Sequence, residues 1–199
     1  LALSTRYDGD FVSGIRALEQ AVEAVGTVFP ATIDKTYLVG QLSDGQIIKG
    51  ESKLDRPDYD RSLTLKKVWL EPAGVAYPPA LAAVKEANYI IFAPGSLYCS
   101  VVAAFLPDGF GAAFRDSKAR LVYATTNRLE QDGETGPRIL SDFVHMLEEY
   151  LQRSLDMIVF NNFSPSVEQK MYFNDHSFDT IEFDAKNLAS YKIISEPFE

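Results

Sequence analysis

Apolar runs of strand length alternate with stretches of helical spacing through the middle of the chain. The run at 89–93 (YIIFA) has no polar face, which predicts a central strand buried on both sides in a parallel sheet. Similar runs at 120–125 and 157–160 predict further strands. Apolar residues recur every three or four positions over 139–153, which predicts an amphipathic helix. Strands alternating with helices across 65–160 predict a parallel sheet with crossover helices.

The flanking segments predict shorter elements. A helix over 11–25 follows Asp10 as its N-cap, and Ser43-Asp44-Gly45 joins 37–42 and 46–50 into a β-hairpin. Polar residues at 51–62 predict a surface loop, and the tail from 164 onward predicts short strands at most. The remaining predictions are a strand at 65–70 and helices at 78–87, 100–106 and 111–117.

Composition places the chain among ordinary globular proteins. Its 199 residues suit one α/β domain over 1–199, with a mostly parallel sheet, helices on both faces and the β-hairpin. The formal net charge is −9 with no basic cluster, which argues against nucleic acid as a partner. Cys99 is the single cysteine, so an intrachain disulfide and a cysteine-rich zinc site are excluded, and a reducing cytoplasm is expected. No apolar run reaches the length of a membrane span.

The turn after the strand at 89–93 has features of an anion site. Pro94-Gly95 ends the strand, and the hydroxyls of Ser96 and Ser100 precede an apolar, helix-like run. Glycine allows close approach to the backbone, and the first N–H groups of a helix lack partners. We therefore expect Gly95, Ser96 and Ser100 to bind a phosphate. The alternative is an ordinary strand-to-helix connection that binds nothing.

A second polar loop, 126–136, follows the strand at 120–125. The carboxyl ends of neighbouring parallel strands meet at one edge of a sheet, so both loops are expected to face one crevice. Asn127, Glu134 and Thr135 would form the opposite wall of that crevice. Asn127 would otherwise close the loop by an Asx-turn, and Glu134 would be a solvated carboxylate. Tyr98 would either stack on a ligand ring or pack in the core.

The histidines, the glycine motifs and the aspartate cluster of the sequence predict no specific chemistry. The two histidines, His145 and His176, accompany no G-x-S-x-G elbow, so a serine hydrolase is not favoured. Neither G-x-G-x-x-G nor a P-loop motif occurs. Asp55, Asp58 and Asp60 alternate with arginines, which predicts a solvated charged loop rather than a calcium site.

A succession of short motifs resembles the CofD-like family over nearly the whole chain. These motifs are GTVFPAT (26–32), DGQIIKGES (44–52), VWLEP (68–72), APGSLYCS (93–100), QDGET (131–135) and VFNN (159–162). The family includes 2-phospho-L-lactate transferase and a bacterial branch, often called the gluconeogenesis factor, that binds UDP-sugars. The motifs are nearer to those of the bacterial branch. The resemblance implies a Rossmann-like fold with the ligand at the carboxyl ends of the strands.

The chain departs from the pattern of that branch at several positions. Ala93 and Cys99 stand where the branch has glycine and threonine, and Arg138 and Phe143 replace its tyrosine and histidine. Arg138 would bring to the ligand a positive charge that tyrosine lacks, or would otherwise be a solvated residue in the first turn of a helix. The family also opens with a Gly-rich G-G-G-T-G turn that is absent here. The resemblance therefore implies a chain that is incomplete at its N-terminus, the carboxyl part of a CofD-like domain.

Taken together, these features predict a nucleotide-sugar (UDP-sugar type) binding regulatory protein, with a nucleotide or phosphorylated small molecule as its partner. One alternative is a transferase of the phospholactyl type, for which the resemblance implies magnesium as the cofactor. A second is a non-catalytic interaction domain. A homodimer is left open as an oligomeric state.

Overall fold

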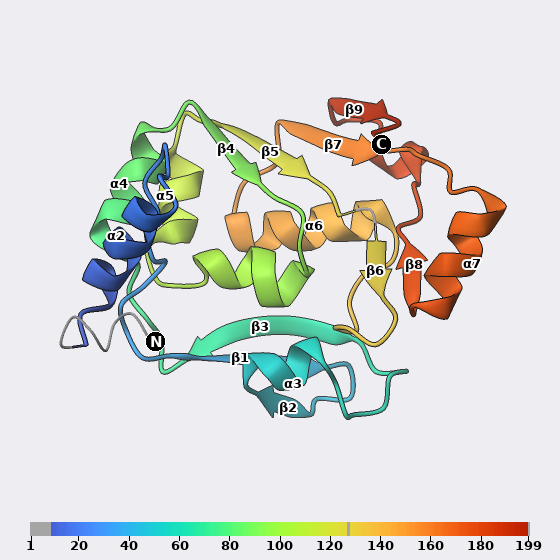
Figure 1. The fold of residues 1–199 in the computed structure, drawn as a ribbon, viewed down its shortest axis with the longest axis horizontal. Coiled ribbons are helices and arrows are strands. Elements are labelled where there is room, and N and C mark those ends of the chain that lie inside the picture. The colour runs from blue at the N-terminus through green and yellow to red at the C-terminus, as the bar shows by residue number, and fades with distance from the viewer. Residues whose placement is uncertain (1–8, 127, 199) are drawn as a thin grey trace.

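The computed structural model describes residues 9–126 and 128–198, which form three layers (Figure 1). The upper layer in that view is a sheet of four parallel strands in the order β4 (Tyr89–Phe92), β5 (Arg120–Ala124), β7 (Met157–Asn161) and β9 (Ile193–Glu196). The predicted α/β fold, with a mostly parallel sheet flanked by helices and an added hairpin, is confirmed.

The lower layer is an antiparallel sheet in the order β2-β1-β3. Its strands are β1 (Tyr37–Leu42), β2 (Ile47–Lys49) and β3 (Leu65–Glu71). The predicted hairpin is confirmed: Asp44 accepts a hydrogen bond from the Gln46 N–H, and Gly45 adopts a φ of 93°. The strand predicted at 65–70 exists as β3, but it pairs with β1 instead of continuing the parallel sheet.

Helical segments fill the middle layer and carry most of the core. The helix α6 (Leu140–Leu151) buries one apolar face, and Tyr150 at its end accepts a hydrogen bond from the Val68 N–H of β3 at 2.7 Å. Beneath β4, the rings of Phe92, Phe105 and Phe114 meet edge to face. The remaining helices of this part are α4 (Pro78–Glu86), a π-helical turn η1 (Leu97–Val102), a 3₁₀ turn η2 (Ala103–Phe105) and α5 (Phe110–Asp116).

The amino-terminal helix α2 (Phe11–Ala21) is shorter than the predicted 11–25. Asp10 caps it as expected by accepting the N–H groups of Val12 and Ser13. Beyond the helix end, Glu23 has a positive φ of 50°, and Val22 and Val25 are exposed. The apolar spacing therefore continues past the last helical turn without a surface to pack against.

Two predictions outside the parallel sheet were wrong. The polar segment 51–62 contains a helix, α3 (Glu51–Asp55), because Leu54 on it is fully buried. The tail holds α7 (Val167–Asp175), a 3₁₀ turn η3 (Ala185–Leu188) and the strand β9. It also holds β8 (Phe178–Thr180), which pairs with β6 (Arg128–Glu130) from the loop after β5. The helix α7 has no buried residue, so hydrophobic spacing gives no sign of it; a capping box at Ser166 and Gln169 starts it instead.

The strand β4 lies at an edge of the sheet rather than at its centre. Within the described residues it pairs with β5 alone. The side chains of Tyr89 and Ile91 are 57% and 64% exposed, whereas Phe92 packs into the core. The prediction of a central strand buried on both sides was therefore wrong. A fully apolar run indicates two apolar faces but does not show whether both are covered.

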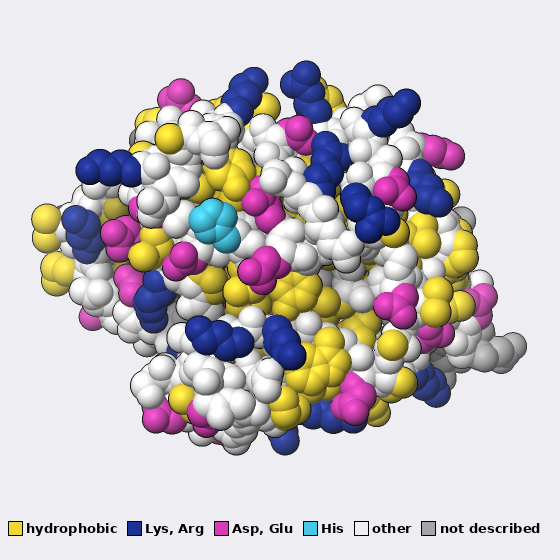
Figure 2. Space-filling view, turned by 180° about the vertical axis from the view of Figure 1, so that it is seen from behind, with side chains coloured by type: hydrophobic (Ala, Val, Ile, Leu, Met, Phe, Trp, Pro, Cys, Tyr) yellow, Lys and Arg dark blue, Asp and Glu magenta, His cyan; other side chains and the backbone are white. Residues whose placement is uncertain are grey.

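Hydrophobic side chains also gather in a band across the rear face of the molecule (Figure 2). The band runs between the upper and lower layers, and Lys, Arg, Asp and Glu side chains are interspersed around it. In the part of the chain that is described, no helix is both long and apolar enough to cross a membrane.

Candidate functional site

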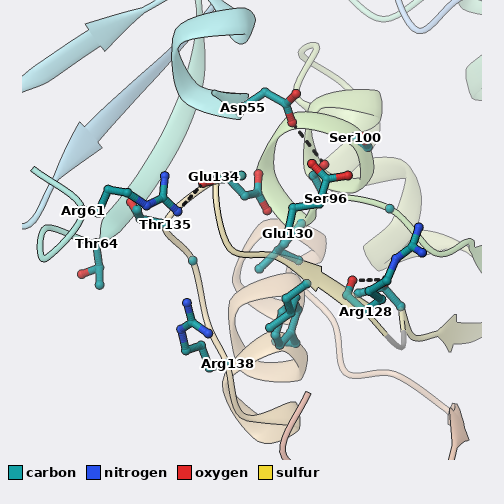
Figure 3. Close-up of a pocket in the computed structure, with 17 residues that line it drawn as sticks. Asp55, Arg61, Thr64, Ser96, Ser100, Arg128, Glu130, Glu134, Thr135 and Arg138 are labelled. Atoms are coloured by element: carbon teal, nitrogen blue, oxygen red, sulfur yellow. Dashed lines mark hydrogen bonds between the residues drawn. The ribbon is translucent and has the colours of Figure 1, made fainter. Parts of the chain in front are cut away.

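A cavity of about 740 Å³ opens beyond the carboxyl ends of β4 and β5 (Figure 3). The turn after β4 contributes Gly95, Ser96 and Ser100 to its lining. The loop after β5 contributes a longer set: Thr126, Arg128, Leu129, Glu130, Gly133, Glu134, Thr135, Gly136 and Arg138. The rest of the lining comes from α3, the segment before β3, η1 and α6, so all three layers meet at this cavity: Asp55, Arg61, Thr64, Leu97 and Phe143.

The sequence correctly predicted that the two loops lie together. Ser96, Ser100, Glu134, Thr135 and Arg138 all line the same cavity (Figure 3). Asn127 falls outside the described residues. The ligand-binding roles of these residues stay predictions.

Glu134 does not lie across the crevice from the Gly-Ser turn but is hydrogen-bonded to it. Its two carboxylate oxygens accept the Tyr98 N–H at 3.1 Å each, and one of them accepts the Cys99 N–H at 3.0 Å. These N–H groups start η1 and have no acceptor one turn earlier. The first amides of the helical turn are therefore already taken by an anionic side chain of the protein itself.

Two opposing effects act on the Glu134 carboxyl group. Part of the residue remains accessible, but its carboxylate is enclosed, and this burial raises the pKa of Glu134 above its ordinary value. Hydrogen bonds from the amides of Cys99, Tyr98 and Leu97 act in the other direction and limit the increase. A carboxylate at this depth is stabilised only by such donors.

Tyr98 and Thr135 have structural partners. The Tyr98 side chain is fully buried and donates its hydroxyl hydrogen bond to the Leu65 carbonyl at 3.0 Å, so it packs in the core and does not line the cavity. The backbone carbonyl of Thr135 accepts a hydrogen bond of 2.7 Å from the N–H of Leu65. The side-chain hydroxyl of Thr135 lies 3.0 Å from the hydroxyl of Tyr59. Both residues fix the cavity against β3.

A side chain at position 95 would crowd the turn itself. A Cβ atom at Gly95 would lie 3.0 Å from the Cβ of Ser100, closer than most real contacts. The expectation that this glycine admits a ligand thus has a second reading, in which it allows the turn to fold onto Ser100. The N–H groups of Gly95 and Ser96 have no hydrogen-bond partner among residues 9–126 and 128–198, and both residues line the cavity.

Three arginines surround the cavity, and two of them were missed at the sequence level. Arg61 donates to the carbonyls of Gln131 and Gly133, and the Arg128 guanidinium lies 3.8 Å from the centre of the Phe178 ring. Arg138 lines the cavity as predicted but also pairs with Asp179 at 2.7 Å. Arg61 belongs to the segment predicted as a solvated loop, and no sequence signal placed it beside residue 133.

The acidic residues of the cavity do not form a metal site. The carboxylate of Asp55 accepts a long hydrogen bond of 3.4 Å from the Ser96 hydroxyl, and that of Glu134 is bound to backbone amides. Across the described ranges, no group of three or more His, Cys, Asp or Glu side chains is arranged to hold a metal ion. The donor set present does not fit the magnesium implied by the transferase resemblance.

Comparison with known proteins extends the resemblance. The family model described as 2-phospho-L-lactate transferase CofD matches residues 1–198. A protein of Thermotoga maritima named putative gluconeogenesis factor is 35% identical over the whole chain, and the Bacillus subtilis gluconeogenesis factor is 29% identical over 94% of it. A crystal structure of a Bacillus halodurans protein matches 99% of the chain with a TM-score of 0.87 and 27% identity.

The chain spans only part of each relative. It covers 61% of the Thermotoga protein, 58% of the Bacillus subtilis protein and 63% of the Bacillus halodurans chain. The match over residues 1–198 and the similarity to gluconeogenesis factors lead to one conclusion: this chain belongs to the CofD family.

Proposed function

We propose that the cavity binds a nucleotide sugar of the UDP type and that the chain is a ligand-binding, regulatory member of its family. The observation that carries this proposal is a cavity of about 740 Å³ lined by three arginines and two serine hydroxyls at the carboxyl ends of parallel strands. Ligands of open α/β sheets bind in this position. Arginine matches the planar, multiply charged geometry of phosphate groups.

The cavity offers separate places for the parts of such a ligand. Arg61 and Arg128 lie on opposite sides of it in Figure 3, so a diphosphate between them would meet positive charge from both. The free N–H groups and hydroxyls near Ser96 would donate to phosphate oxygens. Asp55 and Glu130 would accept hydrogen bonds from ribose or sugar hydroxyls.

A matched pair of arginine variants tests the proposal. Arg138 lines the cavity and forms an ion pair with Asp179, whereas Arg115 does not line the cavity and forms an ion pair with Asp116. The side chains of Arg138 and Arg115 are 58% and 54% exposed. Exposed ion pairs contribute little to stability, so both variants should fold. In titration calorimetry with UDP-N-acetylglucosamine, Arg138→Ala should weaken binding about tenfold or more, because a charge-assisted hydrogen bond is lost. Arg115→Ala should bind like the unaltered chain.

Two results would contradict the proposal. One is the absence of heat with UDP-sugars, UDP and UMP at millimolar concentration. The other is an equal loss of affinity in both arginine variants, which would place the ligand elsewhere.

A second candidate is transferase activity, favoured by the description of the matching family model. The chain's described residues gather no metal-binding cluster, so we expect the 199-residue chain alone to form no product from a deazaflavin acceptor and a nucleotide-linked phospholactate donor. Magnesium-dependent product formation by this chain would favour the enzyme instead.

A further inference from the structure

We propose that Glu134 is a positioning residue of the nucleotide site: it occupies the amides of Tyr98 and Cys99 as an internal anion and thereby fixes the turn that presents Gly95, Ser96 and Ser100 to the ligand. This inference rests on the proposed function for its ligand, but the geometry of Glu134 is independent of it.

The Glu134 carboxylate binds the turn as a ligand oxyanion would. The carboxylate meets two successive backbone N–H groups at 3.0–3.1 Å, the arrangement in which a backbone turn binds an oxyanion. The turn is therefore an anion site that is already filled, and a ligand phosphate is left with the neighbouring donors. Those donors are the amides of Gly95 and Ser96, the two serine hydroxyls and the arginines.

The second argument is the position of Glu134 in the chain. It lies 36 residues from Tyr98, so its hydrogen bonds join the turn after β4 to the loop after β5. The next residue, Thr135, bonds to Leu65 of β3, and Tyr98 bonds to the same residue. Both walls of the cavity and the lower sheet are thereby held in one hydrogen-bonded unit.

The third argument is the enclosure of the carboxylate. Burial raises the pKa of Glu134 because it disfavours the charged form, and the hydrogen bonds from the amides of the turn oppose this increase by stabilising that form. Removal of the side chain would leave enclosed amides without acceptors, and the turn would lose its fixed geometry. A small carboxylate added in solution has the chemistry to fill the vacated position.

The experiment compares Glu134→Ala with Glu86→Ala, an exposed glutamate on α4 that is remote from the cavity lining. Glu134→Ala should lower the melting temperature by about 4–8 °C, and acetate at about 50 mM should restore a good part of that loss while formamide, which is neutral, should not. Glu86→Ala should show neither effect. This thermal readout involves no nucleotide, so it tests the filled anion site even if the unaltered chain binds no UDP-sugar.

The second readout is calorimetry with UDP-N-acetylglucosamine. Glu134→Ala should bind at least about tenfold more weakly, and acetate should restore affinity together with stability. Unchanged affinity in a folded Glu134→Ala variant would overturn the positioning role. Tighter binding by that variant would overturn it too, since Glu134 would then compete with the ligand. Failure of acetate to raise the melting temperature would overturn the internal-anion assignment.

Discussion

At the scale of single residues, the cavity depends on groups whose partners lie far along the chain. Arg61 holds the loop at Gln131 and Gly133, and Asp55 accepts a hydrogen bond from Ser96. Each contact joins residues that are between 41 and 72 positions apart. For this reason the sequence predicted the two glycine-containing loops but did not predict Arg61, Arg128 or the direction in which Glu134 points.

The reactivity of the Cys99 thiol depends on the position of Glu134. Burial raises the pKa of Cys99, and the negative charge of Glu134 adds to the increase. Alkylation by iodoacetamide at pH 8 should therefore be slow in the native chain. Glu134→Gln removes the charge and should accelerate the reaction about tenfold for each unit by which the pKa falls.

Because Cys99 is the single cysteine, mass spectrometry of the whole chain measures the rate directly. The chain unfolded in urea provides the reference for a fully accessible thiol. Identical rates in the native chain and in Glu134→Gln would show that the charge of Glu134 does not control this thiol.

At the scale of elements, long apolar or amphipathic segments were predictable and short or polar ones were not. The strands β4, β5 and β7 and the helix α6 follow from hydrophobic runs and spacing. The helix α3 has five residues, which is too few for a helical period to be recognised. The strand β9 is as short as β4, but its sequence, IISE, is half polar and forms no apolar run. The pairing of β6 with β8 depends on a contact between the loop after β5 and the tail, which no local pattern reveals.

The start of α6 illustrates such a long-range contact. Asp184 accepts hydrogen bonds from the N–H and the hydroxyl of Ser141, at 3.0 and 2.6 Å, and so caps the helix from the tail. Partial burial acts to raise the pKa of Asp184, but the hydrogen bonds from Ser141 and Asn187 outweigh it and hold the pKa below the ordinary value.

We expect Asp184→Ala to lower the free energy of unfolding at pH 7 by about 1 kcal/mol. A carboxyl group with a lowered pKa in the folded state stabilises above its unfolded pKa, and this stabilisation is lost as the pH falls through the folded value. The difference between the two proteins should thus shrink below about pH 4. Urea denaturation at several pH values measures it, and a difference that grows on acidification would contradict the cap.

At the scale of the whole molecule, the parallel sheet ends in β4, which pairs only with β5 within the described part of the chain. Tyr89 and Ile91 are exposed on β4, and β9 at the other edge exposes Ile194 by 38%. Unpaired strand edges with apolar side chains promote pairing between chains, and lysine on an edge strand suppresses it. The oligomeric state of the chain, which the sequence leaves undecided, can be tested at the edge formed by β4.

We expect the chain to self-associate with rising concentration and Ile91→Lys to reduce that association without lowering the melting temperature. Ile47→Lys on β2, where Ile47 is 51% exposed, is the matched control and should leave association unchanged. Light scattering after size-exclusion chromatography measures the mass. A native chain that stays monomeric at all concentrations would rule out β4 as a self-association edge.

The strand order of the parallel sheet also has a consequence for biosynthesis. The strands β4, β5, β7 and β9 lie side by side in the order in which the ribosome makes them. Each new strand therefore meets an edge that its predecessor has already formed, and no strand has to be inserted between two others. The residues that line the cavity all lie between positions 55 and 143 of the chain, so they emerge before α6 is complete. Among the described strands of this sheet, β4 at the edge is the one that is made first.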